Sequence, residues 1–70
     1  MENEKIKFAQ ALYDAILKSG YSYEDVASMI DLKSSREIYN YIDGIKWPST
    51  IRMLKLIQLF KLDIDSILSK

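Results

Sequence analysis

Apolar residues recur every three or four positions along most of the chain, a spacing that places them on one face of an α-helix. In the first segment, Phe8, Leu12 and Ile16 follow this spacing through a helix that is expected to run to about Lys18. Gly20 can then take the left-handed conformation that often ends a helix. The pattern therefore predicts a first helix with one apolar face.

Two shorter helices are predicted next, over about Ser22–Ile30 and about Ser34–Asp43. Ser34 and Glu37 match the S-x-x-E capping box, so the second of the two is expected to begin at Ser34. Only residues 31–33 separate the helices, too few for an antiparallel pair without a sharp corner. Two short helices that meet at a corner are typical of the helix-turn-helix pattern, here over about residues 22–43. The apolar residues that share a face are Val26, Ala27 and Ile30 in one helix and Ile38, Tyr41 and Ile42 in the other.

A fourth helix is predicted over about Ser49–Lys61, and Asp63 can cap a short fifth one. Pro48 lies just before the fourth helix, where proline often marks a start. At core spacing the fourth helix has Met53, Leu56, Ile57 and Phe60, and the fifth contains Ile64, Ile67 and Leu68. The predicted fold class is all-α, with five helices in one compact domain over residues 1–70.

Composition limits the chemistry that the chain can carry. With 70 residues it is near the lower limit for a domain that folds without disulfides or metals. It has no cysteine and no histidine, so disulfides, thiolate chemistry and the usual zinc sites are excluded. No catalytic site, cofactor or metal is expected. No apolar run approaches the ~20 residues of a membrane span, and the N-terminus lacks a signal-peptide pattern. We therefore expect a cytoplasmic protein without a membrane partner.

The charges are unevenly distributed, although the net charge is zero. Residues 1–32 carry three lysines and six acidic residues, a balance of −3, whereas residues 33–55 carry five basic and two acidic residues, a balance of +3. The last fifteen residues carry two charges of each sign. The zero total argues weakly against a nucleic-acid partner, but a polyanion would dock where positive charge gathers, over residues 33–55.

Four short motifs, in order, resemble the lambda-repressor-like helix-turn-helix domain of phage repressors and Cro, often called the XRE family. They are Gly20-x-Ser22-x-Glu24-x-Val26-Ala27, Ile38-x-x-Tyr41-x-x-Gly44, Pro48-Ser49 and Leu62-Asp63-Ile64-Asp65-x-Ile67-Leu68. The resemblance covers about Phe8 to Leu68 and implies a compact five-helix domain with the helix-turn-helix at helices two and three. It also implies a bacterial, phage or mobile-element origin. The chain departs from the family at Asp31, where a glycine is usual, and at Tyr23, where a phosphate-binding glutamine often stands.

In this family the first turns of the third helix read bases in the major groove. The resemblance implies that the base-reading residues are Ser35, Arg36, Tyr39 and Asn40. It likewise implies that the phosphate-contacting residues are Ser22, Tyr23, Ser34, Lys46, Trp47 and Ser49. Arginine can bind guanine through two hydrogen bonds, and asparagine can bind adenine in the same way. Without the resemblance, Arg36 and Asn40 would be ordinary solvated side chains, and Trp47 can equally be a packing residue.

The apolar residues outside the core stripe of the fourth helix have two interpretations. Ile51, Leu54 and Leu59 are covered if the fifth helix folds back over them. Alternatively they belong to a homodimer seam, as members of this family commonly pair through the C-terminal helix. The residues predicted for that seam are Ile51, Leu54, Ile64, Ile67 and Leu68.

We expect a sequence-specific DNA-binding transcriptional regulator, a Cro-like or repressor-like homodimer that occludes a promoter on a palindromic operator of double-stranded DNA. It would be nucleoid-associated when bound, and control would come from its concentration or from a regulatory protein partner. The alternative is a protein-interaction module on the same fold, antitoxin-like or antirepressor-like, with little DNA binding. A third interpretation is the amino-terminal domain of a longer repressor.

Overall fold

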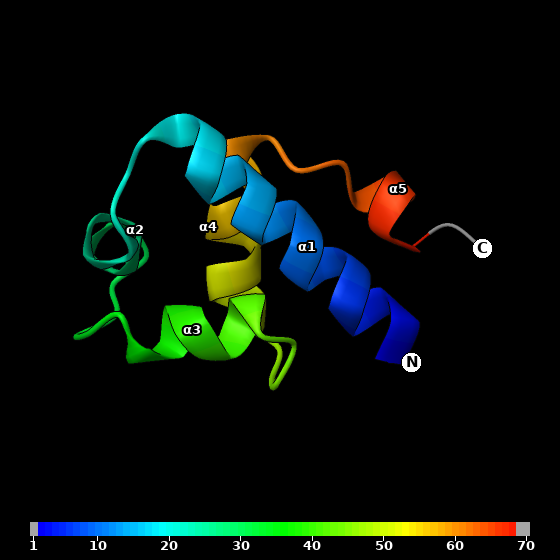
Figure 1. Ribbon diagram of the computed structural model, residues 1–70, viewed down its shortest axis with the longest axis horizontal. Helices are drawn as coiled ribbons and strands as arrows, with labels where there is room; N and C mark the ends of the chain where they lie inside the picture. Colours follow the sequence, from blue (N-terminus) through cyan, green and yellow to red (C-terminus); the bar gives the residue numbers. More distant parts are fainter. Residues whose placement is uncertain (1, 69–70) are drawn as a thin grey trace.

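The structure is a computed structural model that describes the backbone of residues 2–68 and the side chains of residues 4–65 and 67. Regular structure within this part of the chain is entirely helical (Figure 1). Four helices have seven residues or more: α1 (Glu2–Ser19), α2 (Tyr23–Met29), α3 (Arg36–Ile42) and α4 (Thr50–Phe60). The last, α5 (Ile64–Leu68), has five residues, little more than one turn. The radius of gyration is 11.0 Å, the value expected of a compact chain of this length. The predicted compact all-α class is confirmed.

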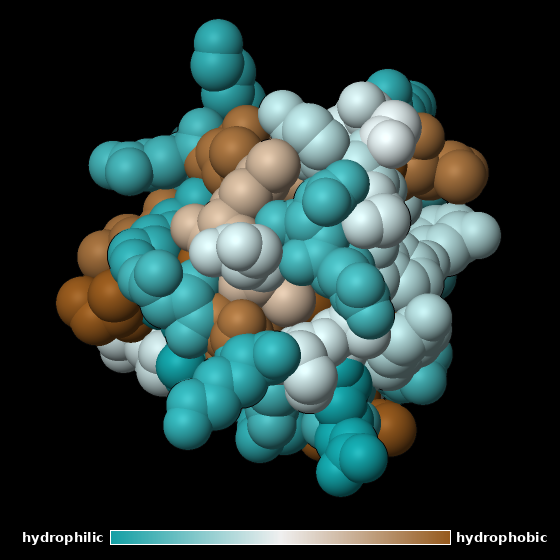
Figure 2. All heavy atoms as spheres, turned by 90° about the vertical axis from the view of Figure 1, so that its left-hand side faces the viewer, coloured by the Kyte–Doolittle hydropathy of each residue, from teal (hydrophilic) through white to brown (hydrophobic). Residues whose placement is uncertain are grey.

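Helix α1 is the central element of the fold, because it packs against α3, α4 and α5 (Figure 1). Helix α2 packs against α3 at one end of the molecule. Seen from that end, most of the surface is hydrophilic or near neutral, and hydrophobic side chains show at several places, the largest group at the left edge (Figure 2). The end of the molecule that carries α2 is therefore largely polar.

The core contains the apolar stripes that the spacing predicted. Leu12 of α1, Ile38 of α3 and Leu56 of α4 are fully buried, so one residue from each helix meets at the centre. Met53, Ile42 and Phe60 are partly buried around them. The buried apolar cluster consists of Phe8, Leu12, Ile16, Val26, Ala27, Ile30, Ile38, Tyr41, Leu56 and Ile67.

The start of α3 differs from the prediction. The helix begins at Arg36, its N-cap Ser35 has helical backbone angles, and Ser35 makes no side-chain capping bond. The Ser34 hydroxyl accepts only a long 3.4 Å hydrogen bond from the Arg36 amide. The expected capping box is wrong because Glu37 pairs with Lys46 instead of bonding back to the backbone. The connection from α2 to α3 therefore runs from Ile30 to Ser35, longer than the three residues predicted.

The α2–α3 connection contains a left-handed residue where the family resemblance would have glycine. Asp31 has a φ of 65°, a conformation that aspartate tolerates better than most residues. The Leu32 amide then donates to the Ala27 carbonyl at 2.8 Å, which closes the turn. The Asp31 carboxylate also pairs with Lys55 of α4, and the hydrogen bond from Lys55 lowers the pKa of Asp31. The ion pair between Asp31 and Lys55 thus links the turn to α4.

Helix α5 packs against α1, so it does not cover the exposed face of α4. Ile67 is 3% exposed and completes the core, so its assignment to a dimer seam is wrong. Ile51 and Leu54 remain 63% and 53% exposed, which also excludes the interpretation that the fifth helix covers them. Ile64 is partly exposed, and the side chain of Leu68 lies outside the described residues.

No helix in the described part of the chain combines the length and the apolar character that crossing a membrane requires.

Candidate nucleic-acid interface

Helix α3 presents polar residues on the side away from the core. Ile38 and Tyr41 are buried and fix the orientation of the helix. Arg36 and Tyr39 are exposed, and Asn40 is half-buried. Within the described part of the chain Arg36 forms no ion pair, so its guanidinium is available to a ligand. Three of the four predicted base-reading residues therefore lie on the accessible side of one short helix.

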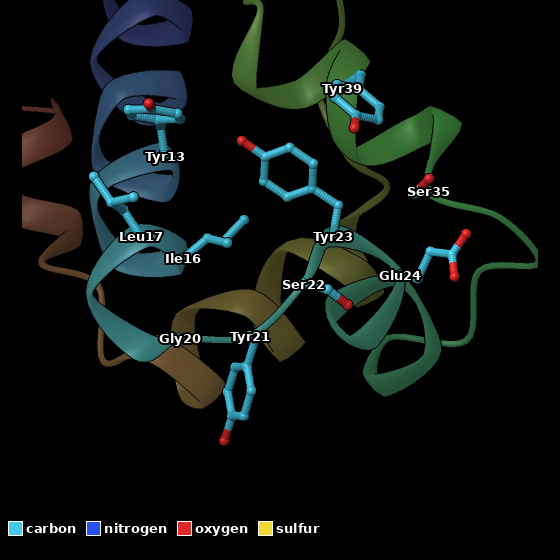
Figure 3. Close-up of a pocket in the computed structure, with 10 residues that line it drawn as sticks. All are labelled: Tyr13, Ile16, Leu17, Gly20, Tyr21, Ser22, Tyr23, Glu24, Ser35 and Tyr39. Atoms are coloured by element: carbon cyan, nitrogen blue, oxygen red, sulfur yellow. The ribbon is translucent and has the colours of Figure 1, made fainter.

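Ser35 and Tyr39 border a pocket with residues from the start of α2 (Figure 3). The rings of Tyr23 and Tyr39 meet edge to face, with centroids 4.8 Å apart and an interplanar angle of 84°. Burial raises the pKa of Tyr23, and Tyr13, Tyr39 and Asp43 raise it further. The Tyr23 hydroxyl is thus neutral at physiological pH and can donate a hydrogen bond.

Ser22 already has a structural role at the start of α2. Its hydroxyl accepts from the Asp25 amide at 3.0 Å, and the Asp25 carboxylate accepts from the Ser22 amide at 3.1 Å. This reciprocal pair is a capping box. The cap uses the Ser22 hydroxyl only as an acceptor, so its proton can still be donated to a phosphate oxygen.

On the other flank of α3, the predicted phosphate contacts are partly engaged with the protein. The Lys46 ammonium lies 2.9 Å from a carboxylate oxygen of Glu37. Trp47 packs against Phe8 of α1 with ring centroids 5.6 Å apart, but it remains 39% exposed. Ser49 is the N-cap of α4, and its hydroxyl accepts from the Arg52 amide at 3.4 Å. Trp47 therefore has the packing role that the sequence left open.

These residues border a second hollow of about 560 Å³, which we call the basic hollow. It brings Lys33, Lys46 and Arg52 together with the acidic residues Asp31 and Glu37. Sequence reasoning did not select Lys33 or Arg52 for the site. Their positions in the sequence could have indicated them, because Lys33 lies in the turn before α3 and Arg52 lies in the first turn of α4, close to Ser49.

The structure thus divides the predicted site residues between two hollows on either side of α3. Ser22, Tyr23, Ser35 and Tyr39 line the pocket at the start of α2, whereas Lys46, Trp47 and Ser49 line the basic hollow. Ser34 lies with Lys33 and Ser35 in a smaller depression beside α2. Neither Arg36 nor Asn40 borders the two larger hollows, which is consistent with side chains that face outward between them.

Comparison of the chain with family models, with curated proteins and with solved structures finds no match to any of the three.

Proposed function

We propose that the protein is a sequence-specific DNA-binding regulator of the lambda-repressor-like class, in which α2 and α3 act as the helix-turn-helix. The observation that carries this proposal is the orientation of α3. Its buried residues Ile38 and Tyr41 hold the helix on the core, and Arg36, Tyr39 and Asn40 occupy the other side. A short helix with an exposed arginine and a half-buried carboxamide one turn apart on the same side suits the base edges of the major groove.

The two hollows beside α3 support the proposal, since phosphate contacts on both sides of a groove fix the register of a recognition helix. The basic hollow supplies Lys33, Lys46 and Arg52 on one flank. The hydroxyls of Ser22, Tyr23 and Ser35 lie on the other flank and can donate to phosphate oxygens. Residues 33–55, which include α3 and the cations of the basic hollow, carry a net charge of +3, and this charge favours binding of a polyanion there.

The proposed regulator acts as a homodimer on a palindromic operator and represses by covering a promoter. The exposed apolar side chains of Ile51 and Leu54, both on α4, support pairing through this helix. Two copies related by a two-fold axis would present two α3 helices to adjacent turns of DNA. A regulatory protein partner remains part of the proposal.

A mobility-shift assay with duplex DNA at two salt concentrations tests this function. Arg36→Ala should relax base preference by about 1–3 kcal/mol, whereas wild-type binding should weaken steeply as salt rises. Lys18→Ala, which removes a cation from the end of α1, is the matched control and should leave base preference unchanged. If Arg36→Ala keeps both affinity and preference, the proposed orientation of α3 on DNA is wrong.

A second candidate function is a protein-interaction module with little DNA binding. It is favoured by the exposed apolar residues Ile45, Ile51 and Leu54, and by the ion pairs that occupy Lys46 and Lys55. Salt-independent or absent DNA binding, together with one stoichiometric partner that co-purifies, would favour this function over the first.

A further inference from the structure

Four tyrosines border one open pocket of about 590 Å³, and three of them come from three different helices (Figure 3). Tyr13 comes from α1, Tyr23 from the start of α2 and Tyr39 from α3. The volume is in the range that small ligands occupy. Ile16 and Leu17 of α1 provide an apolar side to the same pocket. We call this the tyrosine pocket.

Two of the rings in the tyrosine pocket, those of Tyr23 and Tyr39, hold one another in place. Tyr23 stands between Tyr13 and Tyr39, and its hydroxyl points toward α1 (Figure 3). Its edge-to-face contact with Tyr39, at 4.8 Å, fixes both rings without a ligand. Tyr13 is 45% exposed, so its ring is open to solvent and to a ligand. The aromatic surface of the pocket is therefore formed before any ligand binds.

The charges around the tyrosine pocket are negative. Glu24 at its rim is the one charged residue among the described residues that line it, and no lysine or arginine does so. Asp43 acts electrostatically on Tyr23 from the end of α3. The clustered cations Lys33, Lys46 and Arg52 border the other hollow. Electron-rich ring faces attract a cation.

We propose that the tyrosine pocket binds a small organic cation of the alkylammonium or quaternary-ammonium class. The ring faces of Tyr13 and Tyr23 hold the cationic head, and Leu17, which is 66% exposed, contacts its methyl groups. This activity goes beyond the proposed function, since it involves the free protein and does not require DNA.

Choline is the probe, because 3,3-dimethylbutan-1-ol has the same shape without the charge. Titration is followed by NMR shifts of the tyrosine ring protons in the full chain without DNA. Choline should saturate with a Kd of about 1–10 mM, and the neutral alcohol should bind at least about fivefold more weakly. Equal binding of the two compounds, or no saturable shift with choline up to ~50 mM, would overturn the proposal.

A pair of variants then locates the site. Tyr13→Leu, outside the proposed DNA contacts, should weaken choline binding at least about threefold. Tyr21 also borders the pocket, but its ring points away from the other three and contacts Phe60 (Figure 3). Tyr21→Leu is therefore the matched control, because it removes a bordering tyrosine whose ring does not face the proposed cation. Circular dichroism checks that both variants fold. If Tyr13→Leu folds and binds choline as the wild type does, the assignment of the pocket is wrong, whatever the outcome of the DNA-binding experiments.

Discussion

The ion pair between Glu37 and Lys46 predicts that removing the negative charge of Glu37 strengthens the contact of Lys46 with DNA. The sequence alone, which assigns Glu37 to a helix cap, would not predict this effect. Lys46 is a proposed phosphate contact, yet its ammonium lies 2.9 Å and 3.2 Å from the two carboxylate oxygens of Glu37. Both side chains are partly exposed, at 51% for Lys46 and 35% for Glu37. Glu37→Gln keeps the shape of the side chain and removes its charge, so it releases the ammonium for DNA.

The size of the effect follows from counterion release. One additional phosphate contact should make the slope of log K against log salt steeper by about 0.9. Over a fourfold rise in salt, the affinity of the variant should therefore fall about three- to fourfold more than that of the wild type. The folded state should change little, because an exposed ion pair contributes about 0–1 kcal/mol to the free energy of unfolding.

Fluorescence anisotropy with a labelled duplex of random sequence, measured at several salt concentrations, gives the two slopes. Asp14→Asn is the matched control, since it makes the same change in net charge on α1, where Asp14 lies near Leu59 and Phe60 of α4. The control slope should equal that of the wild type. An unchanged slope for Glu37→Gln, or an equal increase for Asp14→Asn, would refute the idea that Lys46 approaches the phosphates.

Three further predictions follow from burial and exposure. Leu12→Ala should lower the free energy of unfolding by about 2–5 kcal/mol in urea titrations, because Leu12 is fully buried, and an effect below 1 kcal/mol would contradict the core described above. Burial raises the pKa of Tyr41 above 10.0, so stability should be complete below about pH 10 and fall as pH rises through the folded-state pKa. Tyr41→Phe should reduce that fall in urea titrations above pH 10, and an identical fall would exclude Tyr41 as its source. Leu54→Lys should convert the proposed dimer to monomer in sedimentation experiments, whereas Gln10→Lys at an exposed position on α1 should not; a wild-type monomer would exclude the seam on α4.

The helices and most of the core could be predicted because their signals are local. The spacing of Phe8, Leu12 and Ile16 places them on one helix face whatever the helix packs against. Ser22 and Asp25 likewise cap α2 through atoms three residues apart. Local periodicity does not, however, decide which of several apolar faces the fold covers. Ile67 is in the core because α5 turns back to α1, and that contact depends on the whole arrangement.

The parts of the candidate site that sequence reasoning missed depend on contacts between distant residues. Glu37 leaves its expected cap because Lys46, nine residues later, is brought beside it by the turn at Gly44. Tyr13 enters the tyrosine pocket because α1, α2 and α3 meet there. Neither contact has a counterpart in the spacing of residues along one helix. The exposed side of α3 was predictable, since it follows from which of its residues are apolar.

Selection of preferred duplexes from a random oligonucleotide pool, with the wild type and with Arg36→Ala in parallel, tests the central claim most directly. The account predicts that the wild type enriches a two-fold symmetric motif, and that Arg36→Ala loses preference for a guanine at one position in each half-site. A wild-type pool without any enriched motif, or the same motif for both proteins, would contradict it.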